Sequence, residues 1–377
     1  MRGAWWWGVV LTVGCASRGT PPRAPLATGV CDQPLGCEEA APSPDATPSS
    51  APTSVVHGHA SAPPHSPSTP PVPLDPPSEP TVGPPPHPWV PIEPSQGHAA
   101  LTELRRRLAS NLGEDHMALQ LAIAQHHLAI AAHPTTPLGE AIAQRQHARQ
   151  LLETMVEDRS AASVAGFDQV LISLALLRMG VDDQGMKTAT LRLIREQPQS
   201  PVVPMAFVVF GDVMFEQGDR EAAAKVYEKA AAFQDSAVEA YARYRQAWSL
   251  LPHGDSPGDS TKSLELFVQA IERAEHALAE QRESKPQLAP GQARVAAPHE
   301  VAAAARRELV IAYADVGQPH KAWPFFARIG RGREGHDMHV EMMVRLARVY
   351  RERSRFDEAA QVCAALAEHT EGTVPCP

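Results

Sequence analysis

Apolar residues recur at helical spacing from Leu101 onward, most regularly between Phe207 and Asp235. At the start of that stretch, large side chains share one helix face with Gly211: Phe207, Phe210 and Met214. Gly218 then breaks the helix, because glycine tolerates a positive φ, and Asp219 can cap the next one. The residues that follow have a single apolar face, at Ala223, Tyr227 and Ala230. The pattern predicts two antiparallel helices joined by a tight turn.

Small and large apolar residues take similar offsets in several further stretches. These copies are less regular, and Val310 stands where the others have a small residue. They cover residues 170–198, 243–270, 309–329 and 346–366. One helix pair cannot bury its own apolar face, so copies that stack on one another are expected. The sequence therefore predicts an all-α fold, an α-solenoid of antiparallel helix pairs.

The predicted organisation has five parts. A signal peptide at 1–15 is followed by a linker at 16–97 and a helical capping region at 98–164. The solenoid is expected at 165–371, with a tail at 372–377.

Proline is concentrated ahead of the helical part. Of 37 prolines, 23 lie between Pro21 and Pro94, and Trp89 is the only Phe, Tyr or Trp between Cys15 and Ala100. Such a segment buries too little apolar area to offset the entropy of ordering it. We expect the linker to be disordered, with polyproline-II character.

The first residues have the pattern of an export signal. Arg2 supplies a positive charge, and the apolar run Ala4–Val13 is too short to span a bilayer. The run ends at Gly14 and Cys15, which resemble a bacterial lipobox, where the cysteine is lipidated after cleavage. We expect Cys15 to carry a lipid. The alternative is an ordinary secretory signal in which the cysteine is incidental.

Four more cysteines are consistent with export, and four cysteines allow three pairings. Proximity favours Cys31 with Cys37, and Cys363 with Cys376. Their spacing does not suit a structural zinc site. Alternatively, Cys363 is simply a small core residue of its helix.

Charge and motifs argue against several functions. The net charge of −9, without a basic stripe, argues against a nucleic-acid partner. Gly330, Gly332 and Gly335 match a dinucleotide loop by letter, but they follow a helical pattern rather than a strand. His336 and His339 are interpreted as a solvated helix start rather than a metal site. We expect no enzymatic activity, no cofactor, no metal and no small-molecule substrate.

The order of positions in residues 207–235 resembles one tetratricopeptide repeat (TPR). From Ala165 to Glu368 the chain is similar to TPR lipoproteins of the bacterial envelope, on the segments QPQSPVVP, YARYRQAW, LVIAYADVG and LARVY. These relatives include the adventurous gliding motility TPR proteins and, more distantly, the TPR lipoprotein of the barrel-assembly machinery.

This resemblance implies a scaffold or adaptor rather than an enzyme. It would be lipid-anchored, at the outer membrane and facing the periplasm, and its partner would be a protein or peptide of the cell envelope. A gliding-motility complex is one such assembly; outer-membrane barrel assembly or secretion is the alternative. From a different class, a metal-binding or enzymatic envelope protein is a further alternative.

The resemblance also suggests where a partner would bind. In TPR superhelices the first helix of each repeat lines a concave groove, and carrying over the offsets gives Val208, Asp212, Phe215, Tyr241, Tyr244, Trp248, Arg307, Ile311, Arg348 and Arg351. Three of these form an aromatic stripe on one helix face, and Tyr and Trp are frequent in binding hot spots. The alternative is that the stripe packs against the next repeat as core.

Overall fold

A computed structural model of the chain describes residues 88–110, 116–158, 165–234, 238–253, 258–284, 288–330 and 338–377. These residues form thirteen α-helices and one 3-10 helix, and no β-strand occurs among them. The helices are α1 (Pro94–Ser110), α2 (His116–Ala131), α3 (Leu138–Glu157), α4 (Phe167–Arg178), α5 (Asp183–Glu196), α6 (Val203–Glu216), α7 (Arg220–Ala231), α8 (Glu239–Leu250), α9 (Ser260–Ser284), α10 (Pro298–Val316), η2 (Pro319–Lys321), α11 (Ala322–Ile329), α12 (Met338–Glu352) and α13 (Phe356–His369). The all-helical prediction is confirmed.

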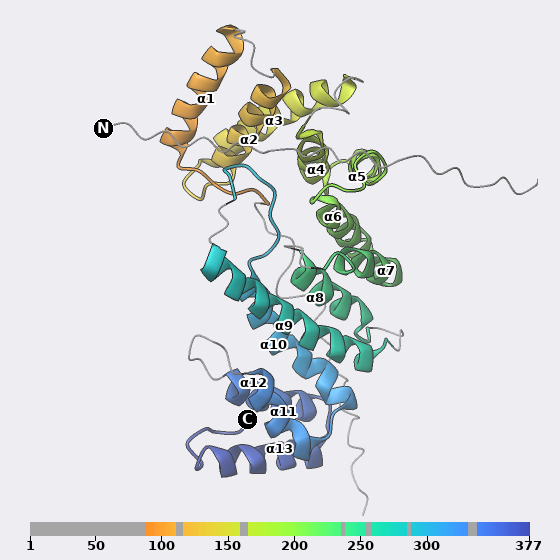
Figure 1. The fold of residues 1–377 in the computed structure, drawn as a ribbon. Helices are drawn as coiled ribbons and strands as arrows, with labels where there is room; N and C mark the ends of the chain where they lie inside the picture. The colour runs from red at the N-terminus through yellow and green to blue at the C-terminus, as the bar shows by residue number, and fades with distance from the viewer. Residues whose placement is uncertain are drawn as a thin grey trace, which may run out of the picture. The chain divides into compact units, whose positions relative to one another are not determined.

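Helices that follow one another in sequence pack as antiparallel neighbours (Figure 1). Pairs of this kind are α4 with α5, α6 with α7, α8 with α9, and α12 with α13. The first helices of successive pairs also contact one another, because α6 lies against both α4 and α8, and α10 lies against both α8 and α12. The faces that connect one pair to the next are therefore covered by protein.

The α6–α7 pair shows how the local sequence sets this packing. A Cβ added at Gly211 would lie 2.7 Å from Cε1 of Tyr227, so only glycine allows the tyrosine ring to come so close. Gly218 has a φ of +84°, and the Asp219 side chain accepts a hydrogen bond from the amide of Ala222. Glycine at the turn and aspartate at the cap are the two features expected from the sequence.

The chain joins the fold earlier than predicted. Trp89, assigned to the linker at 16–97, is 3% exposed, and α1 already begins at Pro94. The Trp89 backbone forms an antiparallel bridge with Ala293, between hydrogen bonds from Val90 N to Gln292 O (3.0 Å) and from Arg294 N to Pro88 O (2.8 Å). The predicted boundary was wrong because one buried indole removes enough apolar surface from water to order its neighbours.

The loop after α9 lies against other parts of the protein. Gly291 has a φ of +75°, and a Cβ there would lie 2.0 Å from the carbonyl oxygen of Gln125 in α2. Its amide donates to the Val90 carbonyl at 2.8 Å. We call residues 88–92 and 289–294 the Trp89 clasp. The clasp joins segments about two hundred residues apart in sequence.

The C-terminal residues are also packed. Cys363 and Cys376 form a disulfide with their Cα atoms 5.6 Å apart, and Val374 lies against the hydrophobic core. The other cysteines, Cys15, Cys31 and Cys37, lie outside the described residues, as does the predicted signal peptide. Within the described ranges, no helix is both long and apolar enough to cross a membrane.

Candidate functional site

The structure buries most of the face predicted to bind a partner. On α6, Val208, Asp212 and Phe215 are 2%, 2% and 8% exposed. On α8, Tyr241, Tyr244 and Trp248 are at most 1% exposed, and Ile311 on α10 is 3% exposed. The assignment of these residues to an open groove was wrong, because α8 contacts both α6 and α10 and these side chains are enclosed in the protein interior.

Asp212 is the centre of a hydrogen-bond network in this interior. It accepts a hydrogen bond from the Tyr227 hydroxyl at 2.6 Å, and Arg245 Nε lies 3.0 Å from the same oxygen. Arg245 also donates to the Tyr227 hydroxyl at 3.1 Å, and its guanidinium lies over the Phe215 ring. The network ties α6, α7 and α8 together.

Burial and pairing act in opposite directions on this ion pair. Burial raises the pKa of the Asp212 carboxyl, and the Arg245 guanidinium partly offsets that shift. Burial is the largest single influence on Arg245 and opposes its charge, but Asp212, Tyr241 and Tyr227 together outweigh burial and raise the pKa of the guanidinium. Arg245 is therefore charged. Among its contacts described above, Asp212 is the acidic side chain that balances this charge.

The aromatic stripe on α8 has its polar atoms directed inward as well. The Tyr244 hydroxyl donates to Glu308 Oε2 at 2.7 Å, and Trp248 Nε1 donates to the same oxygen. Glu308 lies on α10 and is 1% exposed. These contacts make the stripe part of the α8–α10 interface, which was the alternative considered for it.

The basic residues of the predicted set lie nearer the surface. Arg348 and Arg351 on α12 are exposed, and Arg307 on α10 is half-buried. They differ in burial from the enclosed positions on α6 and α8. The set as a whole does not form one surface.

An open groove lies elsewhere, beside the Trp89 clasp. It has a volume of about 620 Å³ and lies between the clasp, α3, the end of α4 and the end of α6. We call it the Trp89 groove. Its walls include Pro88, Trp89, Ile142, Leu177 and Met179.

The exposed apolar lining of the Trp89 groove is characteristic of a binding surface. Ile142 and Val181 line it and are 47% and 79% exposed, so apolar surface is open to solvent. Trp89 Nε1 is buried and has no hydrogen-bond partner in the described structure. An indole N–H nearly always has an acceptor when it is buried. The exposed apolar walls are the part of the groove that a partner could contact, because Trp89 Nε1 is enclosed within the protein.

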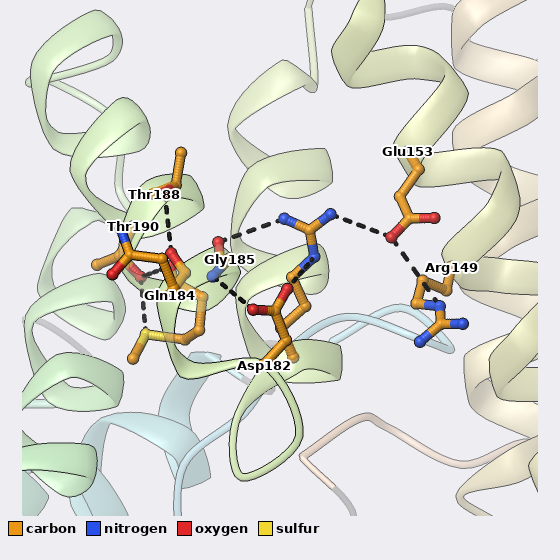
Figure 2. A network of polar contacts seen from close by, with 9 residues as sticks. Arg149, Glu153, Asp182, Gln184, Gly185, Thr188 and Thr190 are labelled. Atoms are coloured by element: carbon orange, nitrogen blue, oxygen red, sulfur yellow. Dashed lines mark hydrogen bonds and ion pairs between the residues drawn. The ribbon is translucent and has the colours of Figure 1, made fainter.

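Charged residues form one end of the groove. Arg145 and Arg149 of α3 and Glu216 of α6 line it. Arg149 Nε lies 4.0 Å from Glu153, a carboxylate that also accepts from Arg178 at 3.0 Å. Figure 2 shows these contacts of Glu153, which belong to a larger network of polar contacts around Asp182 and Gly185.

The network of Figure 2 fixes the α4–α5 turn that carries Val181. Asp182 caps α5 by accepting from the Gly185 amide at 2.9 Å, and Arg178 donates to the Gly185 carbonyl at 3.3 Å. Gly180 has a φ of +72°, which a turn of this kind requires. The turn is thereby held with Val181 directed outward.

Another pocket, of about 520 Å³, lies where α10 ends, between Tyr313, Lys321 and Phe325. Burial raises the pKa of Tyr313 to about 12, and its hydroxyl donates to the Gln318 carbonyl at 3.0 Å. It is smaller than the Trp89 groove, which is the better candidate for the main binding site.

The chemistry of the Trp89 groove suits recognition of a peptide. Among the described residues, no group of three or more His, Cys, Asp and Glu side chains is placed to hold a metal ion. Apolar walls and guanidinium groups match an extended segment with apolar side chains and carboxylates. The sequence signal for this site was Trp89 itself, the single large aromatic in a proline-rich stretch.

No protein-family model matches this chain, and no curated protein matches it.

Proposed function

We propose that this chain is a non-enzymatic scaffold of the bacterial cell envelope that binds a protein or peptide partner through the Trp89 groove. The proposal keeps the TPR-like scaffold expected from the sequence. It places the binding surface at the Trp89 groove instead of on the residues predicted from the TPR offsets. It is supported by one observation above all, which is that exposed apolar side chains, Ile142 and Val181, and two arginines of α3 line the same groove.

The repeat-like architecture is consistent with this role. Stacked helix pairs are stabilised mainly by contacts between neighbours, which leaves surface positions free to vary for binding. The two sides of the groove come from different helices, α3 and the end of α4, so both the apolar and the charged walls are rigidly placed.

Lipid attachment at Cys15 is part of the proposal. It would hold the protein at a membrane, with the outer membrane, facing the periplasm, as the favoured site. Gliding motility is the favoured process among envelope complexes.

The binding surface is tested by capture of partners from detergent-solubilised envelope. We expect Ile142→Arg and Val181→Arg to lower the yield of a stoichiometric partner at least about tenfold, as for a binding hot spot. Leu191→Arg on α5 is the matched control, because Leu191 is 44% exposed and does not line the groove. Equal capture by all three variants would contradict the proposal.

The anchor is tested separately by fractionation. We expect Cys15→Ser to move the protein from the membrane fraction to the soluble fraction of the periplasm. A variant that stays in the membrane fraction would contradict lipid attachment at this residue without affecting the groove.

A further inference from the structure

We propose that the pocket at the end of α10 is a second docking surface, which binds an acidic segment of a partner protein. We call it the Tyr313 pocket, and in its ligand two carboxylates flank an apolar side chain. The pocket is formed by α10, η2 and α11, so the proposal does not rest on the Trp89 groove. It follows from two cations, from the aromatic surface between them, and from their spacing.

The first argument is charge. Lys321 and Arg328 line the pocket and are exposed, and no carboxylate is among the described residues that line it. Neither side chain has a carboxylate partner within the described ranges. Asp315, the acidic residue nearest to the lining in sequence, is already engaged, because it accepts a hydrogen bond from Ser260 at 2.7 Å and pairs with Arg353. Two cations without a counter-charge in an open pocket favour an anionic ligand.

The overall charge of the protein does not prevent this binding. The chain carries a net charge of −9, which repels an acidic segment at long range. At about 0.15 M salt, however, exposed charges more than about 8 Å apart are largely screened from one another. The charges within the Tyr313 pocket therefore decide whether a carboxylate is attracted there.

The second argument is the apolar surface of the pocket. Phe325 is half-buried, and its ring centroid lies 5.0 Å from that of Tyr313, which fixes the position of the ring. The Arg328 guanidinium lies over the Phe325 ring, 5.6 Å from its centroid. Val316, also in the lining, is 43% exposed. An aromatic ring and an aliphatic side chain are thus open to a ligand beside a cation.

The third argument is spacing. Lys321 and Arg328 are seven residues apart, which is two helical turns, so they lie on one face about 11 Å apart along the axis. Phe325 lies on the same face between them. An extended peptide advances about 10 Å in three residues, so carboxylates three positions apart match the two cations. An apolar side chain between those positions would reach the aromatic surface.

Binding of a synthetic peptide to the full chain in a non-ionic detergent tests the proposal. The probe is Gly-Glu-Phe-Pro-Glu-Gly, amidated at its C-terminus and labelled at its N-terminus with a neutral fluorophore, and the readout is fluorescence anisotropy. Proline after the aromatic residue favours the extended backbone. We expect this peptide to bind at least about fivefold more tightly than the same peptide with Gln in place of both Glu.

Variants of the pocket test which cations are used. Lys321→Glu and Arg328→Glu should each weaken binding of the Glu peptide about fivefold. Lys229→Glu on α7 is the matched control, because Lys229 is exposed and does not line the pocket, and it should leave binding unchanged. The double variant Lys321→Glu with Arg328→Glu should bind a peptide with Lys in place of both Glu better than the parent does. A general loss of structure would not produce this reversal.

Several results would overturn the proposal. They are equal binding of the Glu and Gln peptides, or equal effects of Lys229→Glu and Arg328→Glu. Displacement of the peptide by inorganic phosphate at the same concentration as unlabelled peptide would show binding of simple anions only. Displacement by dioctanoyl phosphatidylglycerol at a lower concentration would assign the pocket to lipid headgroups instead.

The two binding surfaces are distinguished by one further variant. Ile142→Arg, which alters the Trp89 groove, should leave binding of the Glu peptide unchanged. Loss of binding in that variant would place the peptide in the Trp89 groove and overturn the present proposal. Failure of partner capture through the Trp89 groove, with peptide binding intact, would contradict only the proposed function.

Discussion

The buried Asp212–Arg245 pair provides a sharp test of the packing between α6 and α8. Both side chains are about 2% exposed, and Nε of Arg245 lies 3.0 Å from Asp212 Oδ1. Asp212→Asn leaves the guanidinium buried without its counter-charge, for which we expect a loss of about 3–5 kcal/mol in the free energy of unfolding. Arg245→Met should cost less, about 2 kcal/mol, because the raised pKa of Asp212 eases protonation of the carboxyl that remains.

The double variant separates the pair from its surroundings. Asp212→Asn with Arg245→Met removes both charges, while the asparagine can still accept a hydrogen bond from Tyr227. Replacing a whole buried pair is far less costly than removing one member, so the coupling energy should be at least about 2 kcal/mol. Urea unfolding followed by circular dichroism at 222 nm supplies the four free energies of the cycle.

An exposed pair serves as the control for this cycle. Lys225 Nζ lies 2.6 Å from Glu221, but the two side chains are 69% and 82% exposed. Lys225→Met with Glu221→Gln should give no measurable coupling, because water screens the two exposed charges. If the buried pair were no more strongly coupled than the exposed one, our account of the α6–α8 interior would be wrong.

Three further results are expected. Gly211→Ala should destabilise the protein by about 1–3 kcal/mol, because its Cβ would lie 2.7 Å from the buried Tyr227 ring, and an unchanged urea midpoint would contradict that packing. Burial holds the pKa of His127 below its ordinary value of 6.5, against the opposing effect of the hydrogen bond that its Nδ1–H donates to the Gln144 side-chain oxygen. As the pH falls below about 6.5, the unfolded chain takes up a proton at His127 before the folded protein does, so the free energy of unfolding declines by up to about 1.4 kcal/mol per pH unit. His127→Gln should make this decline less steep in urea midpoints measured from about pH 7 to about pH 5. Cys376→Ser should cost about 2–3 kcal/mol and make the melting temperature insensitive to dithiothreitol, and a variant as sensitive as the parent would exclude a stabilising role for the disulfide.

Helix pairs could be predicted from the sequence because their signals are local. Gly211, Gly218 and Asp219 lie within nine residues of one another, and each acts through its own backbone or its nearest turn. Periodicity also identified the apolar face of α8 correctly. Periodicity is a local signal and could not show which helix covers that face. Tyr244 and Trp248 donate hydrogen bonds to Glu308, which is some sixty residues away in the sequence.

The Trp89 groove was missed for a similar reason. Proline-rich composition around Trp89 indicates a linker, and no periodic pattern includes a single tryptophan. Its backbone pairs with Gln292 and Ala293, about two hundred residues later in the chain. Composition averages over a window, whereas the free energy of burial comes from one large side chain with a matching surface elsewhere.

The Trp89 clasp determines how the protein responds to tension. Any pull on the chain that precedes Pro88 acts first on the clasp, before it can act on α1, which begins at Pro94. The hydrogen bonds of Val90 and Arg294 pass that force to the segment that leads into α10, and the bond from Ile92 N to Ala129 O (3.2 Å) passes it to α2. A force that pulls on the chain before Pro88 is therefore transmitted to α2 and to the segment before α10, and it does not first unfold α1. Force on the clasp also acts on the wall of the Trp89 groove, because Pro88 and Trp89 belong to both.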